Sequence, residues 1–220
     1  MILFLDLSAQ ESKLNVDFDI RYRFESWNNM NVKYYGESGK NQIGSVNDDF
    51  LLQRIITGFD FKPTEDIEMS LHLQDSRAFG WSLSNNQFPD AFKVGDNKTS
   101  NSYYIKNPNE EFFELYDLSF KFSNILNNMS IIAGRQKISF GDNKIFGPGE
   151  WGNSGRWNWD AIKVEYLLDD LELNFWTGGT KINDPNVTSI PFFNTEYYGI
   201  GSYDRIKVSN NLHFEPFLAS

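Results

Sequence analysis

The stretch Lys13–Trp27, KLNVDFDIRYRFESW, decides the fold, because apolar and polar side chains alternate along its whole length. Successive side chains of a β-strand point to opposite faces. One face therefore receives Leu14, Val16, Phe18, Ile20, Tyr22 and Phe24. The other face receives Asn15, Asp17, Asp19, Arg21, Arg23 and Glu25. The pattern predicts one long strand with two chemically different faces.

The length and charge of this strand favour a membrane setting. A soluble sheet can alternate in the same way, with one face on a core and the other in water. This run, however, exceeds the about 9–11 residues that a tilted strand needs to cross a bilayer. Its polar face is ionic, as expected beside a water-filled lumen. A register shift of one residue would place both arginines in lipid, at roughly 2–4 kcal/mol each near the midplane.

Composition narrows the class of protein. The chain has 220 residues, enough for one domain, and its mean hydropathy is -0.49. No apolar run approaches the about 20 residues of a membrane helix, whereas a barrel strand exposes only alternate residues to lipid. Aromatic residues make up 16% of the chain, as girdles at both membrane interfaces would require. The alternative is a soluble periplasmic β-sandwich whose aromatic rings stack on carbohydrate.

Charge and cysteine content exclude other classes. The net charge of -10 argues against nucleic acid as a partner, because nucleic-acid binding needs a basic surface. The chain has no cysteine, so it has neither disulfides nor thiolate sites. Residues 1–12 are expected to be a signal-peptide remnant or a disordered leader, and 13–220 the β-domain.

The rest of the chain repeats the strand pattern. Further strands are predicted at Phe50–Lys62, Ile67–Ser76, Glu111–Ser123, Met129–Phe140, Trp157–Leu167, Leu171–Lys181 and Glu196–Val208, with a ninth starting at Leu212. Long and short connections alternate, as in an up-and-down antiparallel transmembrane β-barrel whose short turns share one rim. In the strand Met129–Phe140 we expect Ile132, Ile138 and Phe140 on the lipid side, opposite Arg135 and Lys137. Because nine is an odd number and the last strand is cut short, we expect the N-terminal half of a barrel, folded here as a curved open sheet.

Several phrases resemble the alginate export family of outer-membrane porins. They are Arg21-Tyr22-Arg23-Phe24-Glu25, Gln74-Asp75-Ser76-Arg77, Gly134-Arg135-Gln136 followed by Gly141-Asp142, and Trp151-Gly152-Asn153 followed by Arg156 and Asp160. Their order extends over nearly the whole chain. The resemblance implies a monomeric outer-membrane barrel of about eighteen strands that passes an anionic polysaccharide, such as alginate, or other small anions.

The polar faces of the strands supply the candidate pore lining. Its basic members are Arg21, Arg23, Arg54, Arg135, Lys137 and Lys163, and its acidic members are Asp17, Asp19, Glu25, Glu68, Asp117, Glu165 and Glu172. A basic patch would concentrate anions and bind carboxylates through guanidinium groups. The alternative is that acids and bases neutralise one another as cross-strand ion pairs. This mixture weakens the case for a dedicated alginate channel, and we expect a channel for anionic or small polar solutes between outer-membrane lipids.

One loop and two histidines complete the candidates. The Gly-rich loop Gly141–Trp159 either folds inward as a constriction or places its tryptophans in an interfacial girdle, and the girdle is the commoner arrangement. The histidines, His72 and His213, are far apart and belong to no H-E-x-x-H motif, so we expect no metal, no cofactor and no enzyme activity. Asp75 beside Arg77, with Glu110-Glu111, is expected to be a group of solvated charges rather than a glycosidase pair.

Overall fold

A computed structural model describes residues 12–29, 44–83, 93–97, 102–105, 107–142, 147, 152–153, 158–181, 188–193 and 195–220, and only the backbone of 93–97, 102–105 and 196. These residues form an all-β chain. Its strands are β1 (Lys13–Trp27), β2 (Asp48–Thr64), β3 (Ile67–Phe79), β4 (Lys93–Asn97), β5 (Ser102–Ile105), β6 (Glu111–Leu126), β7 (Met129–Gln136), β8 (Trp159–Leu168), β9 (Leu171–Lys181), β10 (Thr195–Tyr203), β11 (Arg205–Ser209), β12 (Leu212–Phe214) and β13 (Phe217–Ala219). No helix in this part of the chain is long and apolar enough to cross a membrane.

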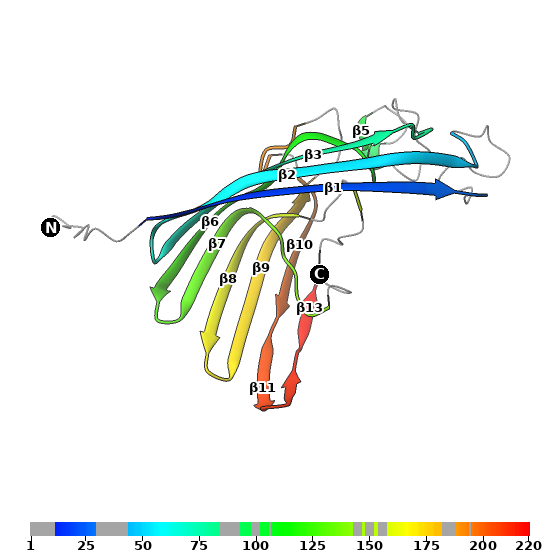
Figure 1. Cartoon of the computed structure of the whole chain (residues 1–220). Helices are drawn as coiled ribbons and strands as arrows, with labels where there is room; N and C mark the ends of the chain where they lie inside the picture. Colours follow the sequence, from blue (N-terminus) through cyan, green and yellow to red (C-terminus); the bar gives the residue numbers. More distant parts are fainter. Residues whose placement is uncertain are drawn as a thin grey trace.

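The main sheet is antiparallel and follows the chain in the order β1-β2-β3-β6-β7-β8-β9-β10-β13, with β11 and β12 attached beside β9. It curves and does not close on itself (Figure 1). β10 and β11 are the two parts of the predicted eighth strand, separated at Asp204. β12 and β13 divide the ninth strand around Glu215-Pro216, where proline has no N–H to give to a ladder. The predicted open antiparallel sheet is therefore confirmed.

The short turns lie along one end of the sheet (Figure 1). They occupy 65–66, 127–128, 169–170 and 210–211, each within a short connection that the sequence predicted. The first turn is tighter than expected, because Pro63 and Thr64 still belong to β2. A register shift between Phe61 and Thr64 accommodates the proline. At the other end, the hairpin β4–β5 lies in a segment that was predicted to be loop, and β3 extends three residues past its predicted end.

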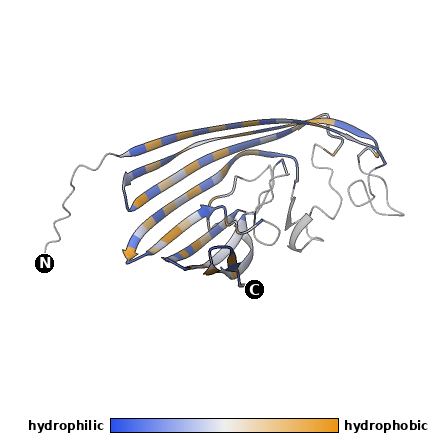
Figure 2. Cartoon of the chain, turned by 60° about the horizontal axis from the view of Figure 1, so that its bottom comes forward, coloured by the Kyte–Doolittle hydropathy of each residue, from blue (hydrophilic) through white to orange (hydrophobic). Residues whose placement is uncertain are grey.

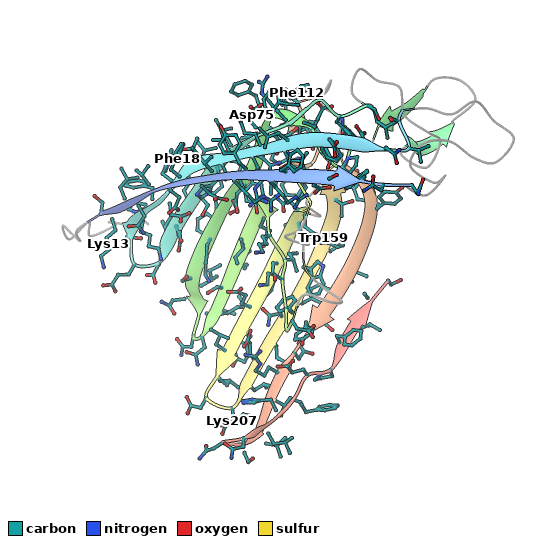
Figure 3. All side chains as sticks on the ribbon, turned by 45° about the vertical axis from the view of Figure 1, so that its right-hand side comes forward. Lys13, Phe18, Asp75, Phe112, Trp159 and Lys207 are labelled. Carbon is teal, nitrogen blue, oxygen red and sulfur yellow. The ribbon has the colours of Figure 1, made fainter. Side chains whose placement is uncertain are left out.

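One face of the sheet is apolar and uncovered within the described chain. On β1, Val16 is 73% exposed and Phe18 68% exposed. Equivalent positions on later strands include Phe120 and Phe175, and the alternation is visible along each ribbon in Figure 2. Phe18, Asp75 and Phe112 lie along this side (Figure 3). The predicted facing of β1 is confirmed.

The predicted facing of the strand Met129–Phe140 is wrong for its apolar residues. Ile132 pairs with Lys121 on one side and Lys163 on the other, so it lies among charged residues of the polar face. Ile138 and Phe140 lie beyond the end of β7 and belong to a buried cluster. Within β7, Ile131 and Ala133 share the face of Phe122 and Phe120, and Ile132 lies on the other face. Ile138 and Phe140 leave the alternation because the strand ends at Gln136, before the predicted limit.

Two hydrophobic clusters support the sheet near its long-loop end. Phe50 of β2 packs edge-on against Trp27 at 4.9 Å between ring centroids and also contacts Trp81. The second cluster consists of Ile138, Ala161, Trp176 and Tyr203, with Phe140 and Trp159 against it. Trp159 packs against this cluster, with its ring centroid 6.4 Å from that of Trp176, which favours the inward alternative over the girdle for this residue. Trp151 and Trp157, the other two tryptophans of that prediction, lie outside the described residues.

A row of small residues crosses the middle of the sheet. Ser70 pairs with Ser119, which pairs with Gly134, and the row continues through Ala161, Gly178 and Gly199. Gly134 has φ +123, and a Cβ there would lie 2.2 Å from the Leu118 carbonyl oxygen. Only glycine fits that position, because both the backbone conformation and the contact exclude a side chain.

Candidate functional site

The charged residues predicted to line a pore mostly meet one another. On β1 and β2, Arg54 Nη2 lies 3.2 Å from Asp19 Oδ2, and Arg23 Nη2 lies 2.6 Å from Glu25 Oε1. Near the turns, Lys62 Nζ lies 2.8 Å from Glu68 Oε2. These contacts support the ion-pair alternative over a continuous basic patch.

Some of these pairs span an intervening strand. Lys121 on β6 and Lys163 on β8 both bind Glu165, at 2.9 and 2.8 Å. The Lys121 contact passes over β7, and the contact from His72 on β3 to Asp17 on β1 passes over β2 at 3.4 Å. Side chains converge on the concave face of a curved sheet and splay apart on the convex face. The charged face is therefore the inward-curving one.

Arg135 lies in a separate, fully buried network. Its guanidinium binds the carboxylate of Asp160 through two hydrogen bonds, of 2.7 and 2.9 Å. Nη1 donates to Glu114 Oε1 at 2.9 Å and to Ser189 Oγ at 2.8 Å. All of these side chains are excluded from solvent. Arg135 thus ties β6, β7 and β8 to the segment 188–193 and presents no charge to a solute.

Lys137 and Arg21 are placed differently from these residues. Lys137 follows the end of β7 and is exposed. Arg21 is half-buried on β1, and its Nη2 donates to the Gly152 carbonyl oxygen at 2.7 Å. The same nitrogen lies 3.5 Å from Asn153 Oδ1. Arg21 therefore connects the first strand to a dipeptide of the predicted inward loop.

Asn153 fixes this dipeptide against the polar face. Its Nδ2 donates to the carbonyl oxygens of Gln53, Arg77 and Asn109, at 2.9, 3.2 and 2.8 Å. Its own carbonyl oxygen accepts a hydrogen bond from Ser76 Oγ at 2.8 Å. Asn153 is fully buried. The inward alternative therefore holds for Gly152-Asn153, which lies over β1, β2 and β3.

The acids considered for glycosidase chemistry do not form a pair. Arg77 Nε binds Asp75 Oδ2 at 2.8 Å, and the Arg77 guanidinium lies 5.2 Å from the Phe112 ring centroid. Asn107 Nδ2 donates to Glu110 at 3.1 Å. Burial raises the pKa of Glu110, and this hydrogen bond opposes the shift. Glu111 instead forms a buried ion pair with Lys181 at 3.2 Å.

The sequence interpretation missed several of these residues. Glu114 is the clearest, because it interrupts the apolar run Phe112–Leu115 and a carboxylate there needs a buried partner. Lys181 and Ser189 carry no comparable signal, since their partners lie far away in the sequence. Asp117 pairs in register with His72 on the polar face, as predicted for Asp117. Glu172 lies near the short turns, 3.9 Å from Arg205.

Comparison with known proteins adds no assignment. No protein-family model matches the chain, and no curated protein matches it significantly.

Proposed function

We propose that this chain forms part of the wall of an outer-membrane β-barrel channel for small polar or anionic solutes. In this proposal the apolar face contacts lipid and the charged face borders water. The alginate export family is the proposed relationship, on the motif residues described above. Several of those residues meet in space, because Arg21, Ser76 and Arg77 all bind Gly152-Asn153 and Arg135 binds Asp160.

The observation that carries the proposal is the exposure of the apolar face. Soluble proteins seldom expose contiguous apolar surface of more than a few hundred Å². Here the apolar positions of β1 alone, from Leu14 to Phe24, are 46–73% exposed. A β-sandwich would bury this face under a second sheet, and no described residue covers it. Lipid is the environment that removes such a face from water.

The charged face supports passage rather than tight binding. Its acids and bases are largely paired, so the field along the wall is close to balanced and a solute meets alternating signs. Selectivity in a channel comes from width and from charge at close range. Gly152-Asn153 lies over the polar face and is held by main-chain carbonyls, so it narrows the water-filled space beside β1–β3.

Site-directed labelling tests the facing directly, because the chain has no cysteine of its own. Phe18→Cys and Asp19→Cys are neighbouring single-cysteine variants on β1. In outer membranes, a charged maleimide should label Asp19→Cys, whereas a label carried at Phe18→Cys should be quenched by brominated lipid. Equal labelling at both positions, with no lipid quenching, would contradict the proposal and favour the soluble sandwich.

Conductance tests transport itself. Protein purified from outer membranes should give discrete current steps in a planar bilayer. The reversal potential in a salt gradient then measures the preference between anions and cations. Membrane insertion without current steps would retain the lipid contact and exclude the channel.

A further inference from the structure

We propose that Asp17, Asp60 and His72 form a binding site for a first-row divalent metal ion, with zinc as the reference ion. One ligand atom from each residue lies within 4.8 Å of the other two. The residues come from β1, β2 and β3, so a bound ion would join three neighbouring strands. The site is independent of what the apolar face contacts.

Strand register brings these groups together. Asp17 pairs with Gly58, Gly58 with His72, and His72 with Asp117, so four strands contribute to one row. Gly58 leaves the space that the imidazole needs. A Cβ at this position would lie 2.7 Å from His72 Cδ2 and 2.0 Å from the Leu71 carbonyl oxygen. The ring of His72 therefore lies across β2 and reaches Asp17.

The contact between His72 and Asp17 is a long hydrogen bond, and its length also fits two ligands of one metal ion. His72 Nε2 and Asp17 Oδ2 are 3.4 Å apart. Two ligands of a tetrahedral zinc ion, each about 2.1 Å from the metal, stand about 3.4 Å apart. Mixed imidazole and carboxylate donors suit zinc and its neighbours, whereas calcium and magnesium prefer all-oxygen sites.

The charges around the site favour a cation. Among the described residues, no lysine or arginine lies within ion-pair distance of Asp17, Asp60 or Asp117. This separates them from Asp19, Glu25 and Glu68 on the same face, each of which has a basic partner. Among the described residues, His72 is thus the one titratable base beside Asp17, Asp60 and Asp117.

Serine hydroxyls orient two of the carboxylates. Ser70 Oγ donates to Asp60 Oδ1 at 2.5 Å, and Ser119 Oγ donates to Asp117 Oδ1 at 2.8 Å. Partners of this kind hold ligand groups in position, and their removal typically costs about 10–100-fold in metal affinity. Asp117 pairs with His72 in register on β6 and adds negative charge beside the three proposed ligands.

The test uses the intact protein in detergent. A chelator first removes any bound metal, and zinc binding is then measured by titration in a calorimeter. The expected result is one equivalent of zinc bound with higher affinity than calcium. His72→Gln should lower the zinc affinity at least about 10-fold, and Ser70→Ala should lower it about 10-fold. His213→Gln is the matched control, because the chain has only these two histidines and His213 is exposed on β12.

Two outcomes would overturn the site: unchanged zinc affinity in His72→Gln, or equal loss in His213→Gln. If His72→Gln fails to fold, Asp17→Asn replaces it, because Asp17 is exposed on β1 and its loss leaves the packing intact. X-ray absorption at the zinc edge should show one imidazole with oxygen ligands. Binding is measured without a membrane, so failed conductance and failed zinc binding remain separate results.

Discussion

The Arg135 guanidinium and the Asp160 carboxylate face each other through two hydrogen bonds, Nε–Oδ1 at 2.7 Å and Nη2–Oδ2 at 2.9 Å. Both side chains are fully buried, and Glu114 adds a second carboxylate to the same guanidinium. Removal of one partner from a buried pair leaves uncompensated charge, which is more costly than the pair is stabilising.

Arg135→Met is therefore expected to lower the free energy of unfolding by about 3–5 kcal/mol. The loss arises because Asp160 and Glu114 stay buried without their cation. Urea unfolding in detergent measures it. Arg205→Met is the control, because the Arg205–Glu215 pair is solvent-accessible and such pairs contribute about 0–1 kcal/mol. A similar loss of unfolding free energy in both variants would show that the buried network stabilises the fold no more than an exposed ion pair does.

Asn153→Asp tests the inward dipeptide. The substitution keeps the shape of the side chain but replaces an NH2 donor with an oxygen that faces three carbonyl oxygens. Each buried group left without a partner costs about 1–3 kcal/mol, enough to release the dipeptide from β2 and β3. On the proposed function, single-channel conductance rises. Asn211→Asp in an exposed turn is the control and should leave conductance unchanged.

Phe18→Arg tests the apolar face energetically. An arginine near the bilayer midplane costs about 2–4 kcal/mol, so the variant should be less stable in lipid vesicles by that amount. Phe18→Leu, which stays apolar at the same position, should differ little from the parent protein. An arginine tolerated as well as leucine would place Phe18 in water.

Gly58→Ala tests the close approach of β2 and β3. The added methyl meets the Leu71 carbonyl oxygen and the His72 ring, and overpacking of this kind costs about 1–3 kcal/mol. Thermal unfolding should show the loss, and zinc titration should show weaker binding because His72 is displaced. Phe59→Leu, one residue away on the opposite face of β2, is the control for both measurements. Unchanged stability and zinc affinity in Gly58→Ala would contradict the prediction.

Arg23→Gln tests the charge balance of the polar face. The change leaves Glu25 without the basic partner that lies 2.6 Å away. The reversal potential should then move toward cation preference, because fixed charge at close range sets selectivity. Lys207→Gln is the control. The exposed Lys207 side chain lies near the short turns, 3.8 Å from Asp170, so its loss should shift the reversal potential less. An unchanged reversal potential in Arg23→Gln would exclude Arg23 from the pore lining.

The sequence predicted the strands well, because period-two alternation is local and repeats on every strand. β1 and β9 begin and end where predicted. The prediction was wrong where local pattern and tertiary packing disagree. Ile138 and Phe140 continue an apolar alternation, yet they pack on Trp176 because the ladder ends at Gln136. The roles of Asn153, Ser189 and Lys181 depend on partners distant in the chain, which no local pattern encodes.

The row from Ser70 through Gly134 to Gly199 has a mechanical consequence. Where side chains are small, neighbouring strands can tilt toward one another without steric resistance. Bending of the sheet therefore concentrates along that line. In the proposed channel this line would then add to the curvature of the wall, beside the number of strands, which sets the diameter. A bulky residue introduced at Ala161 would oppose that bending while the charged side chains stayed the same.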